Sequence, residues 1–106
     1  MPYVHQVSFN LPQNQSAELK IGAPLQRVIA YLRALLPNEV GYVTSRAMYS
    51  IDNSDRMRVV FQSVWENWDH LVAHRNSQVM EGKTLTEFGH LVTGNDITSQ
   101  SFAEVA

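Results

Sequence analysis

Apolar and polar positions alternate with a period of two at the start of the chain. Residues 2–11 are rich in β-forming side chains, and successive side chains of a strand point to opposite faces. One face would carry Tyr3, His5, Val7 and Phe9, and the other would carry Val4, Gln6, Ser8 and Asn10. Pro12 lacks a backbone N–H and residues 12–20 are polar, so we expect the strand to end in a loop.

The spacing then changes to that of an amphipathic helix. Six apolar residues follow the i, i+3, i+4, i+7 rule and form one stripe: Leu25, Val28, Ile29, Leu32, Leu35 and Leu36. Pro24 suits the first turn of a helix, because no backbone N–H is needed there. Pro37 disfavours helical geometry in the residue before it and, with Asn38 and Gly41 after it, ends the predicted helix.

Two further β-forming runs surround a short polar turn. Residues 42–51 and 57–65 have the composition of strands, and the turn cluster Asp52-Asn53-Ser54-Asp55 lies between them. Two strands joined by so short a turn form a hairpin. Helical spacing returns over residues 67–75 and 80–93, Gly94-Asn95-Asp96 would end the second of these helices, and residues 98–105 have the composition of a last strand.

The predicted order of elements is β-α-β-β-α-α-β. This is the ferredoxin-like order of a split βαβ unit with one extra helix, which is an α+β fold with an antiparallel sheet. We expect one domain over residues 1–106, because the chain has the length of a single domain and shows no repeats or linkers.

Both faces of the predicted hairpin carry apolar side chains. On the third strand Met57, Val59, Phe61 and Trp65 share one face, and Val60 and Val64 lie on the other beside Arg58, Gln62 and Glu66. On the second strand we expect Val43, Ala47, Tyr49 and Ile51 on one face, with Tyr42 and Met48 opposite. The helices of this topology cover one face only, and we expect this to be the face with Phe61 and Trp65. We expect a second copy to cover the face with Val60, Gln62 and Val64, with two-fold symmetry. The alternative is an exposed face with scattered apolar residues, which is common on monomers.

Composition narrows the class of partner. The chain is 44% hydrophobic and 17% charged, which is typical of a globular domain. A net charge of −2 offers no broad positive surface, so nucleic acid is not expected as a partner. The lack of cysteine excludes disulfides and thiol nucleophiles. The sequence shows no membrane-spanning apolar run and no signal-peptide pattern, so we expect no membrane association and a cytoplasmic location.

Residues 36–77 carry the most specific pattern in the sequence. They read LPNEVGYVTSRAMYSIDNSDRMRVVFQSVWENWDHLVAHRNS, with a strand that ends in Val64-Trp65-Glu66 and a short helix that ends in Ala73-His74 before Ser77. This arrangement resembles the antibiotic biosynthesis monooxygenase (ABM) superfamily of dimeric α/β barrels. The superfamily includes cofactor-independent oxygenases of polycyclic aromatic compounds, haem-degrading enzymes, quinol oxygenases and members of unknown role. The resemblance implies a homodimer that binds a small molecule.

The first hypothesis implied by the resemblance is a cofactor-independent monooxygenase that acts on a small aromatic or quinol-like substrate. Such an enzyme uses no metal or flavin, so no cofactor is expected. An electron-rich substrate would be deprotonated in an apolar pocket, and the protein would supply desolvation, orientation and a hydrogen-bond donor for the oxyanion. Trp65 matches a pocket tryptophan of the oxygenase and haem-degrading branches, which makes it the first catalytic candidate. The alternative is a core tryptophan whose N–H is satisfied locally.

His74 is the second catalytic candidate. It matches the haem-iron ligand of the haem-degrading branch, but Val7 stands where that branch has an asparagine, and Asn10 falls on the other strand face. Haem binding is therefore a lesser hypothesis, and a partly exposed or helix-capping histidine is the alternative. His70 and His74 also have the spacing of the zinc motif H-E-x-x-H. Leu71 replaces the glutamate of that motif and no third ligand is evident, so no metal site is expected.

Five residues are candidates for substrate binding: Tyr3, His5, Val7, Phe61 and Arg46. The first three share one strand face, and Phe61 shares the face of Trp65. His5 could act as a base near neutral pH or be structural, and Arg46 could hold a carboxylate or phenolate or pair across the dimer. A non-catalytic dimeric protein that binds a small molecule on the same scaffold is the other open hypothesis, because one fold serves many functions.

Overall fold

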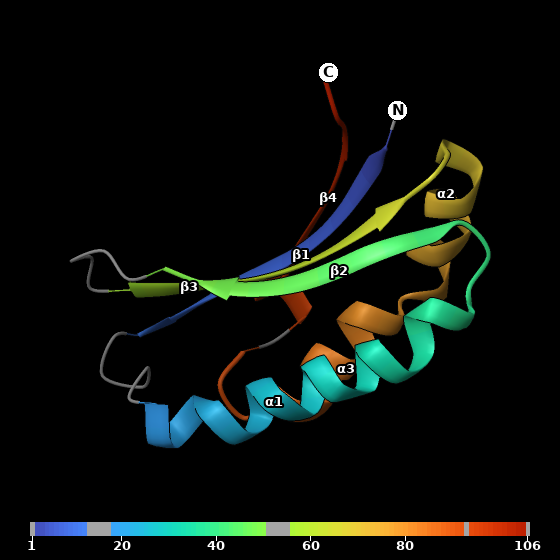
Figure 1. Cartoon of the computed structure of the whole chain (residues 1–106). Helices are drawn as coiled ribbons and strands as arrows, with labels where there is room; N and C mark the ends of the chain where they lie inside the picture. The colour runs from blue at the N-terminus through green and yellow to red at the C-terminus, as the bar shows by residue number, and fades with distance from the viewer. Residues whose placement is uncertain (1, 13–17, 51–55, 93, 106) are drawn as a thin grey trace.

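The computed structural model describes residues 2–12, 18–50, 56–92 and 94–105 (Figure 1). Its elements are, in chain order, β1 (Tyr3–Pro12), α1 (Glu18–Leu35), the 3-10 helix η2 (Leu36–Asn38), β2 (Tyr42–Tyr49), β3 (Arg56–Trp65), α2 (Trp68–Ser77), α3 (Val79–Phe88), the 3-10 helix η3 (Gly94–Asp96) and β4 (Thr98–Ala103). Apart from the two short 3-10 helices, this is the predicted order, and the chain has a ferredoxin-like α+β fold.

The four strands form one sheet in the order β2-β3-β1-β4, and each neighbouring pair is antiparallel. Helices α1 and α3 lie beneath one face of the sheet, and α2 lies at one end of it (Figure 1). The helices of the described chain leave the opposite face of the sheet uncovered.

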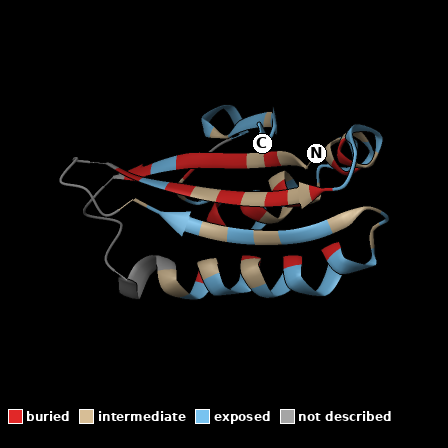
Figure 2. Ribbon diagram, turned by 45° about the horizontal axis from the view of Figure 1, so that its top comes forward, coloured by how far each residue is buried: buried red, intermediate tan, exposed pale blue. Residues whose placement is uncertain are grey.

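The core lies between the sheet and the helices. Its apolar residues, each at most 5% exposed, are Val7, Phe9, Leu11, Val28, Leu32, Leu36, Met57, Val59, Phe61, Trp65, Leu71, Met80, Phe88 and Val92. Phe9 packs against both Phe61 and Phe88, with ring centroids 6.2 and 5.0 Å apart. The predicted inward faces of the first and third strands are confirmed, and Figure 2 shows buried positions recurring along these strands.

The start of β2 departs from the predicted alternation. The pairing of β2 with β3 shifts register just after Tyr42, so one extra residue bulges from β2 there. Tyr42 pairs with Trp65, and its ring packs edge-on against the indole at 5.9 Å, whereas Val43 is half exposed. The prediction that Val43 shares the face of Ala47, with Tyr42 opposite, is therefore wrong. Because the bulge adds one residue to β2, Tyr42 lies on the helix side of the sheet and Val43 on the uncovered face.

Two predicted helix boundaries are also wrong. α1 begins at Glu18, inside the segment expected as a loop, so Pro24 lies in the helix interior and not in its first turn. Proline leaves one helical carbonyl without its usual N–H partner, and burial of the apolar ring offsets part of that loss. α3 ends at Phe88 and does not extend to residue 93. The N–H groups of Leu91 and Val92 both donate to the Phe88 carbonyl, at 2.8 and 3.0 Å, which closes a turn.

The remaining differences from the predicted elements are small. β4 ends at Ala103 and not at residue 105, and β2 ends at Tyr49. The predicted turn over residues 52–55 and Ile51 before it lie outside the described residues. Among the helices of the described ranges, none has the length and apolar character needed to cross a membrane.

Gly41, between η2 and β2, is a position where the fold has no room for a side chain. Its φ of 84° lies in the left-handed region, and a Cβ there would overlap the His70 ring. We expect Gly41→Ala to lower the free energy of unfolding by about 2 kcal/mol or more, because the clash adds to backbone strain. Urea unfolding measures this change.

Gly82→Ala, in α3, is the matched control. Nothing lies within 4 Å of the Cβ that it would add, and alanine inside a helix should raise the free energy of unfolding by about 0.5–1 kcal/mol. Equal stability of the two variants would contradict the role assigned to Gly41.

Candidate functional site

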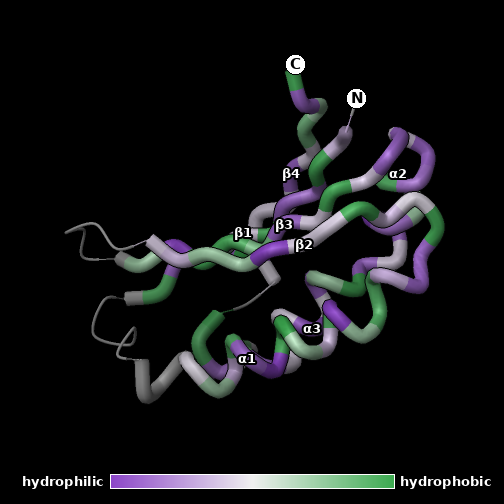
Figure 3. Tube along the Cα trace, viewed as in Figure 1, coloured by the Kyte–Doolittle hydropathy of each residue, from purple (hydrophilic) through white to green (hydrophobic). Residues whose placement is uncertain are grey.

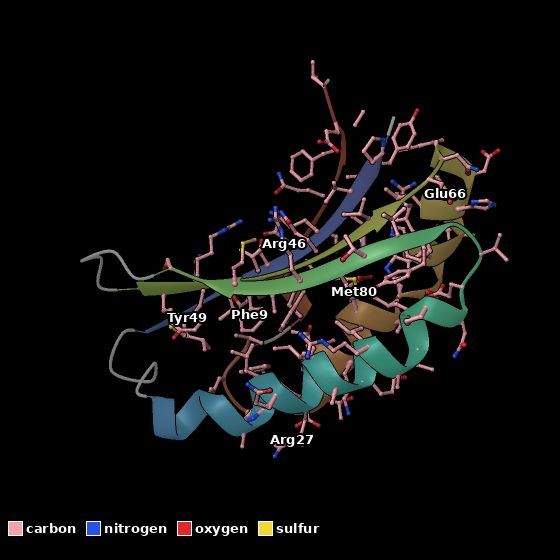
Figure 4. All side chains as sticks on the ribbon, viewed as in Figure 1. Phe9, Arg27, Arg46, Tyr49, Glu66 and Met80 are labelled. Carbon is pink, nitrogen blue, oxygen red and sulfur yellow. The ribbon has the colours of Figure 1, made fainter. Side chains whose placement is uncertain are left out.

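Two histidines, a serine, a tryptophan and a methionine come together beneath the sheet. His5 comes from β1, Ser63 and Trp65 from β3, His74 from α2 and Met80 from α3, and each is at most 2% exposed. We name these five residues the buried histidine cluster. Figure 4 labels Met80, which lies between the sheet and the helices. The cluster unites the two catalytic candidates with one of the predicted substrate-binding residues.

Local structure brings His74 to the cluster. The Asn67 side chain caps α2 by accepting the His70 N–H at 3.0 Å. At the end of α2, Gln78 takes a left-handed conformation, with a φ of 53°, and α3 begins at the next residue. This sharp turn between the helices lets His74 and Met80 face the same space.

The Trp65 side chain is part of the core on the helix side of the sheet, where we expected it. Its indole N–H donates to the Ser63 Oγ at 2.9 Å, and the Ser63 hydroxyl donates to the Met80 Sδ at 3.5 Å. The indole stacks on the His74 imidazole, with centroids 4.5 Å apart and planes inclined by 27°. The polar atom of Trp65 is therefore satisfied inside the protein.

Burial keeps His74 neutral. Its Nε2 lies 3.2 Å from the Met80 Sδ, and its Nδ1 lies 3.4 Å from a Glu39 carboxylate oxygen. Burial of the ring lowers the pKa of His74 to about 4; the nearby His5 acts in the same direction and Glu81 opposes it. Partial burial also raises the pKa of the Glu39 carboxyl. His74 is only 2% exposed, so the alternative of a partly exposed histidine is wrong. Its buried Nδ1 has no hydrogen-bond partner among the described residues.

His5 joins the cluster to a carboxylate nearer the surface. Its Nε2 lies 3.2 Å from the Glu81 Oε1, and its ring meets the His74 ring edge-on with centroids 5.3 Å apart. The His5 side chain is 0% exposed, whereas that of Glu81 is 18% exposed. The His5 Nδ1 is buried and has no hydrogen-bond partner in the part of the chain that the structure describes.

A cavity of about 170 Å³ lies between α1 and β2, and we name it the helix-side cavity. Its lining residues are Ile29, Leu32, Arg33, Ser45, Arg46, Ala47 and Phe61. Of the predicted substrate-binding residues, Phe61 and Arg46 line it, whereas Tyr3, His5 and Val7 do not. Neither catalytic candidate lines it. Ile29 and Leu32 belong to the predicted apolar stripe. The helical spacing cannot tell a residue that lines a cavity from one in the core, so the sequence did not identify them as cavity residues.

A chain of contacts joins the helix-side cavity to the buried histidine cluster. Ser45, at the cavity wall, shares a hydrogen bond with the Tyr42 hydroxyl at 3.0 Å. The Tyr42 ring packs edge-on against Trp65, which stacks on His74. The two catalytic candidates thus lie behind the cavity wall.

A second, wider hollow of about 690 Å³ lies on the uncovered face of the sheet, and we name it the open-face groove. It is lined by Pro2, Val4, Gln6, Val43, Thr44, Arg46, Gln62, Val64, Phe102 and Glu104. The Arg46 Nε donates to the Gln62 Oε1, and the Gln62 Nε2 donates to the Gln6 Oε1, each at 2.8 Å. Figure 3 shows hydrophobic and hydrophilic segments intermixed along the strands. The groove therefore combines apolar walls with a polar row across its floor.

Within the described ranges, no three His, Cys, Asp or Glu side chains converge to hold a metal ion. His70 precedes His74 by one helical turn, but its ring lies against Gly41. His70 and His74, which have the spacing of the zinc motif, therefore lie in different surroundings.

No family model and no curated protein matches the sequence. Solved structures match it over almost the whole chain. SnoaB, a cofactor-independent oxygenase from Streptomyces nogalater, shares 16% identity over 100% of this chain and 96% of its own, with a TM-score of 0.61. A proposed antibiotic biosynthesis monooxygenase from Nitrosomonas europaea shares 12% identity over 98% and 90% of the two chains, with a TM-score of 0.64.

A dimeric ferredoxin-like protein of unknown function from Jannaschia sp. CCS1 shares 15% identity over 96% of this chain and 99% of its own, with a TM-score of 0.66. At these identities the likenesses show the fold. The chain has the ferredoxin-like fold of these proteins, so the fold that the resemblance implied is confirmed.

The buried, neutral state of His74 predicts a loss of stability in acid. Its folded pKa is about 4 and its ordinary value is 6.5, so the unfolded chain binds more protons between these values. The free energy of unfolding should therefore fall as the pH is lowered through this window. In His74→Gln, the free energy of unfolding should fall less over this pH window, by on the order of 2 kcal/mol.

Urea unfolding at successive pH values measures the slope. His90→Gln, which replaces an exposed histidine just after α3, is the control and should keep the slope of the wild type. If the free energy of unfolding of His74→Gln depends on pH as steeply as that of the wild type, His74 does not cause the loss of stability in acid.

Proposed function

We propose that the protein is a homodimeric, cofactor-independent monooxygenase that acts on a small aromatic or quinol-like molecule. The helix-side cavity is the observation that carries the proposal, because it combines an aromatic wall, aliphatic side chains and the Arg33 side chain in one space. The likeness of the fold to that of SnoaB, a cofactor-independent oxygenase, supports the same class of reaction.

The size of the cavity favours a small, flat substrate. Phe61 supplies an aromatic wall, and Leu32 and Ala47 add apolar surface that excludes water. The volume of about 170 Å³ is well below the roughly 300 Å³ at which pockets for drug-sized molecules begin. One or two fused rings are the size that this space suits.

The charge of the lining favours an ionised substrate oxygen. Arg33 lines the cavity from α1, whereas the Arg46 guanidinium donates to Gln62 on the uncovered face of the sheet (Figure 4). A guanidinium beside a phenol stabilises the phenolate and so lowers the pKa of the phenol. The Ser45 hydroxyl, which meets the Tyr42 hydroxyl at 3.0 Å, is a second polar group that could bind the substrate oxygen. An electron-rich phenolate is the species that reacts with O₂ without a metal or flavin.

The proposed reaction balances without a cofactor. With 1,4-naphthohydroquinone, one oxygen atom of O₂ forms a C–O bond at a ring carbon, and the product is 2-hydroxy-1,4-naphthoquinone. The other oxygen atom leaves as water, together with two hydrogens of the substrate. The substrate supplies all four electrons that reduce O₂. The protein contributes binding, desolvation and stabilisation of the anion.

Trp65 and His74 would act as positioning residues in this reaction. The Trp65 indole lies between the His74 ring and the Tyr42 ring, at 4.5 and 5.9 Å. Tyr42 in turn holds the Ser45 hydroxyl at the cavity wall. Trp65→Phe should therefore lower the rate by shifting Ser45, and an unchanged rate would remove Trp65 from the mechanism.

Oxygen uptake with 1,4-naphthohydroquinone and 1,4-benzohydroquinone tests the activity. Arg33→Gln removes a charge from the cavity, and we expect kcat/KM to fall at least about tenfold, because a charge-assisted hydrogen bond to the phenolate is lost. Product analysis separates 2-hydroxy-1,4-naphthoquinone from the quinone that forms by uncatalysed oxidation.

Arg58→Gln is the matched control for the loss of a guanidinium. Arg58 lies on β3, donates to the Ser8 Oγ at 2.7 Å and lines neither hollow, so its loss should leave kcat/KM unchanged. No enzyme-dependent oxygen uptake with either substrate, or equal losses in Arg33→Gln and Arg58→Gln, would contradict the proposal.

One observation favours a second candidate, a non-catalytic dimeric protein that binds a small molecule. Among the described residues that line the helix-side cavity, none is a histidine or carboxylate that could serve as a base. Tight binding of 2-naphthol that is recovered unchanged, without oxygen uptake by either substrate, would support this candidate.

The open-face groove supports the homodimer. Val4, Val43, Val64 and Phe102 line it, and Val43 and Phe102 are 50% and 43% exposed in the single chain. A second copy placed sheet against sheet would cover these side chains. The likeness to a dimeric ferredoxin-like protein supports the same assembly.

We expect Val64→Glu to convert the dimer to a monomer, because each copy would bury an unpaired carboxylate in the interface. Val105→Glu makes the same change at a residue that is 89% exposed, and this control should stay dimeric. Light scattering at micromolar concentration measures the mass of each variant. A monomeric wild type, or a dimeric Val64→Glu, would rule out this interface.

A further inference from the structure

We propose that the buried histidine cluster binds one copper(I) ion through the His5 Nδ1, the His74 Nε2 and the Met80 Sδ. Thioether sulfur and imidazole nitrogen are donors that suit copper(I). None of the three side chains lines the helix-side cavity, so the inference is independent of the proposed oxygenase activity.

Two spacings in the buried histidine cluster match those of side chains that bind one ion. Two imidazoles that bind one metal at about 2.0 Å, in trigonal or tetrahedral geometry, have ring centroids roughly 5–5.5 Å apart. The His5 and His74 centroids are 5.3 Å apart. A nitrogen about 2.0 Å and a sulfur about 2.3 Å from the same ion lie roughly 3.5 Å apart. The His74 Nε2 and the Met80 Sδ are 3.2 Å apart, so only a small shift would admit the ion between them.

Each histidine also has a carboxylate beside its other ring nitrogen. The His5 Nε2 lies 3.2 Å from the Glu81 Oε1, and the His74 Nδ1 lies 3.4 Å from the Glu39 Oε2. A metal-bound histidine commonly donates its second N–H to such a carboxylate, which fixes the tautomer and turns the other lone pair toward the metal. In this tautomer the buried His5 Nδ1, which lacks a hydrogen-bond partner among the described residues, is free to be a ligand.

The surroundings favour a soft ion with a single charge. The three donor side chains are at most 2% exposed, so the ion would lose its water. Magnesium and calcium need oxygen ligands, and zinc prefers thiolate, imidazole or carboxylate donors, so a thioether ligand favours copper(I). Glu39 and Glu81 stand next to the ligating rings and would offset its positive charge. The Ser63 hydroxyl, 3.5 Å from the Met80 Sδ, helps to hold the sulfur in place.

Anaerobic competition against bicinchoninate measures copper(I) binding without reference to any activity. The whole chain should take up one equivalent of copper(I), and X-ray absorption should show a sulfur atom about 2.3 Å from the copper. Zinc(II) offered in its place should be lost on gel filtration. Retention of one equivalent of zinc(II) with no uptake of copper(I) would overturn the choice of metal.

Met80→Leu tests the thioether ligand. Leucine keeps most of the volume of methionine in a packed core, so the fold should persist. We expect the copper(I) affinity to fall at least about tenfold and the sulfur signal to disappear. Met57→Leu is the matched control, because Met57 is a core methionine, 3% exposed, outside the buried histidine cluster. It should bind copper(I) as the wild type does.

Two results would overturn the proposal. The first is a wild-type protein that leaves all the copper(I) with bicinchoninate. The second is a Met80→Leu variant that binds copper(I) as tightly as Met57→Leu, with the sulfur signal intact.

Discussion

Helices cover only one face of the antiparallel sheet, and the rest of the structure depends on this asymmetry. On the covered face, water is excluded, so a buried polar group that has no partner inside the protein costs free energy. Ser63 is such a partner for the indole of Trp65, and Glu81 is one for a nitrogen of His5. On the uncovered face, Val43 and Phe102 stay partly exposed, so a second copy could bury them.

The covered face of the sheet has two regions, one closely packed and one with a cavity. Near α2 and α3, the buried histidine cluster is closely packed and polar. Near α1, the helix-side cavity leaves about 170 Å³ of space beside Phe61 and Arg46. The hydrogen bond between Tyr42 and Ser45 links the two regions. Trp65 and His74, the residues singled out by the family resemblance, lie in the packed region and not at the helix-side cavity.

The sequence predicted the features that depend on local periodicity. Alternation along β1 and β3 identified their inward faces, because a regular strand turns each successive side chain to the opposite side. The bulge after Tyr42 could not be predicted, since it depends on how β2 pairs with β3. The early start of α1 was missed because Pro24 resembles a first-turn residue.

In the candidate site, too, some features follow from the local sequence and others depend on tertiary packing. Phe61 and Arg46 could be proposed from their strands, but Arg33 reaches the cavity only because α1 packs beneath β2. The approach of His5 to His74 depends on two elements far apart in the sequence, and no spacing of residues indicates it. His74 was expected to be a ligand or an exposed residue, whereas packing against Trp65 makes it buried and neutral.

The central claim is that the helix-side cavity holds an anionic aromatic molecule. Methyl-detected NMR of the whole protein, titrated with 2-naphthoate, tests this claim without turnover. We predict the largest chemical-shift changes at the methyl groups of Ile29, Leu32 and Ala47, which line the cavity. Changes confined to Val4 and Val64 in the open-face groove, or no changes at all, would contradict it.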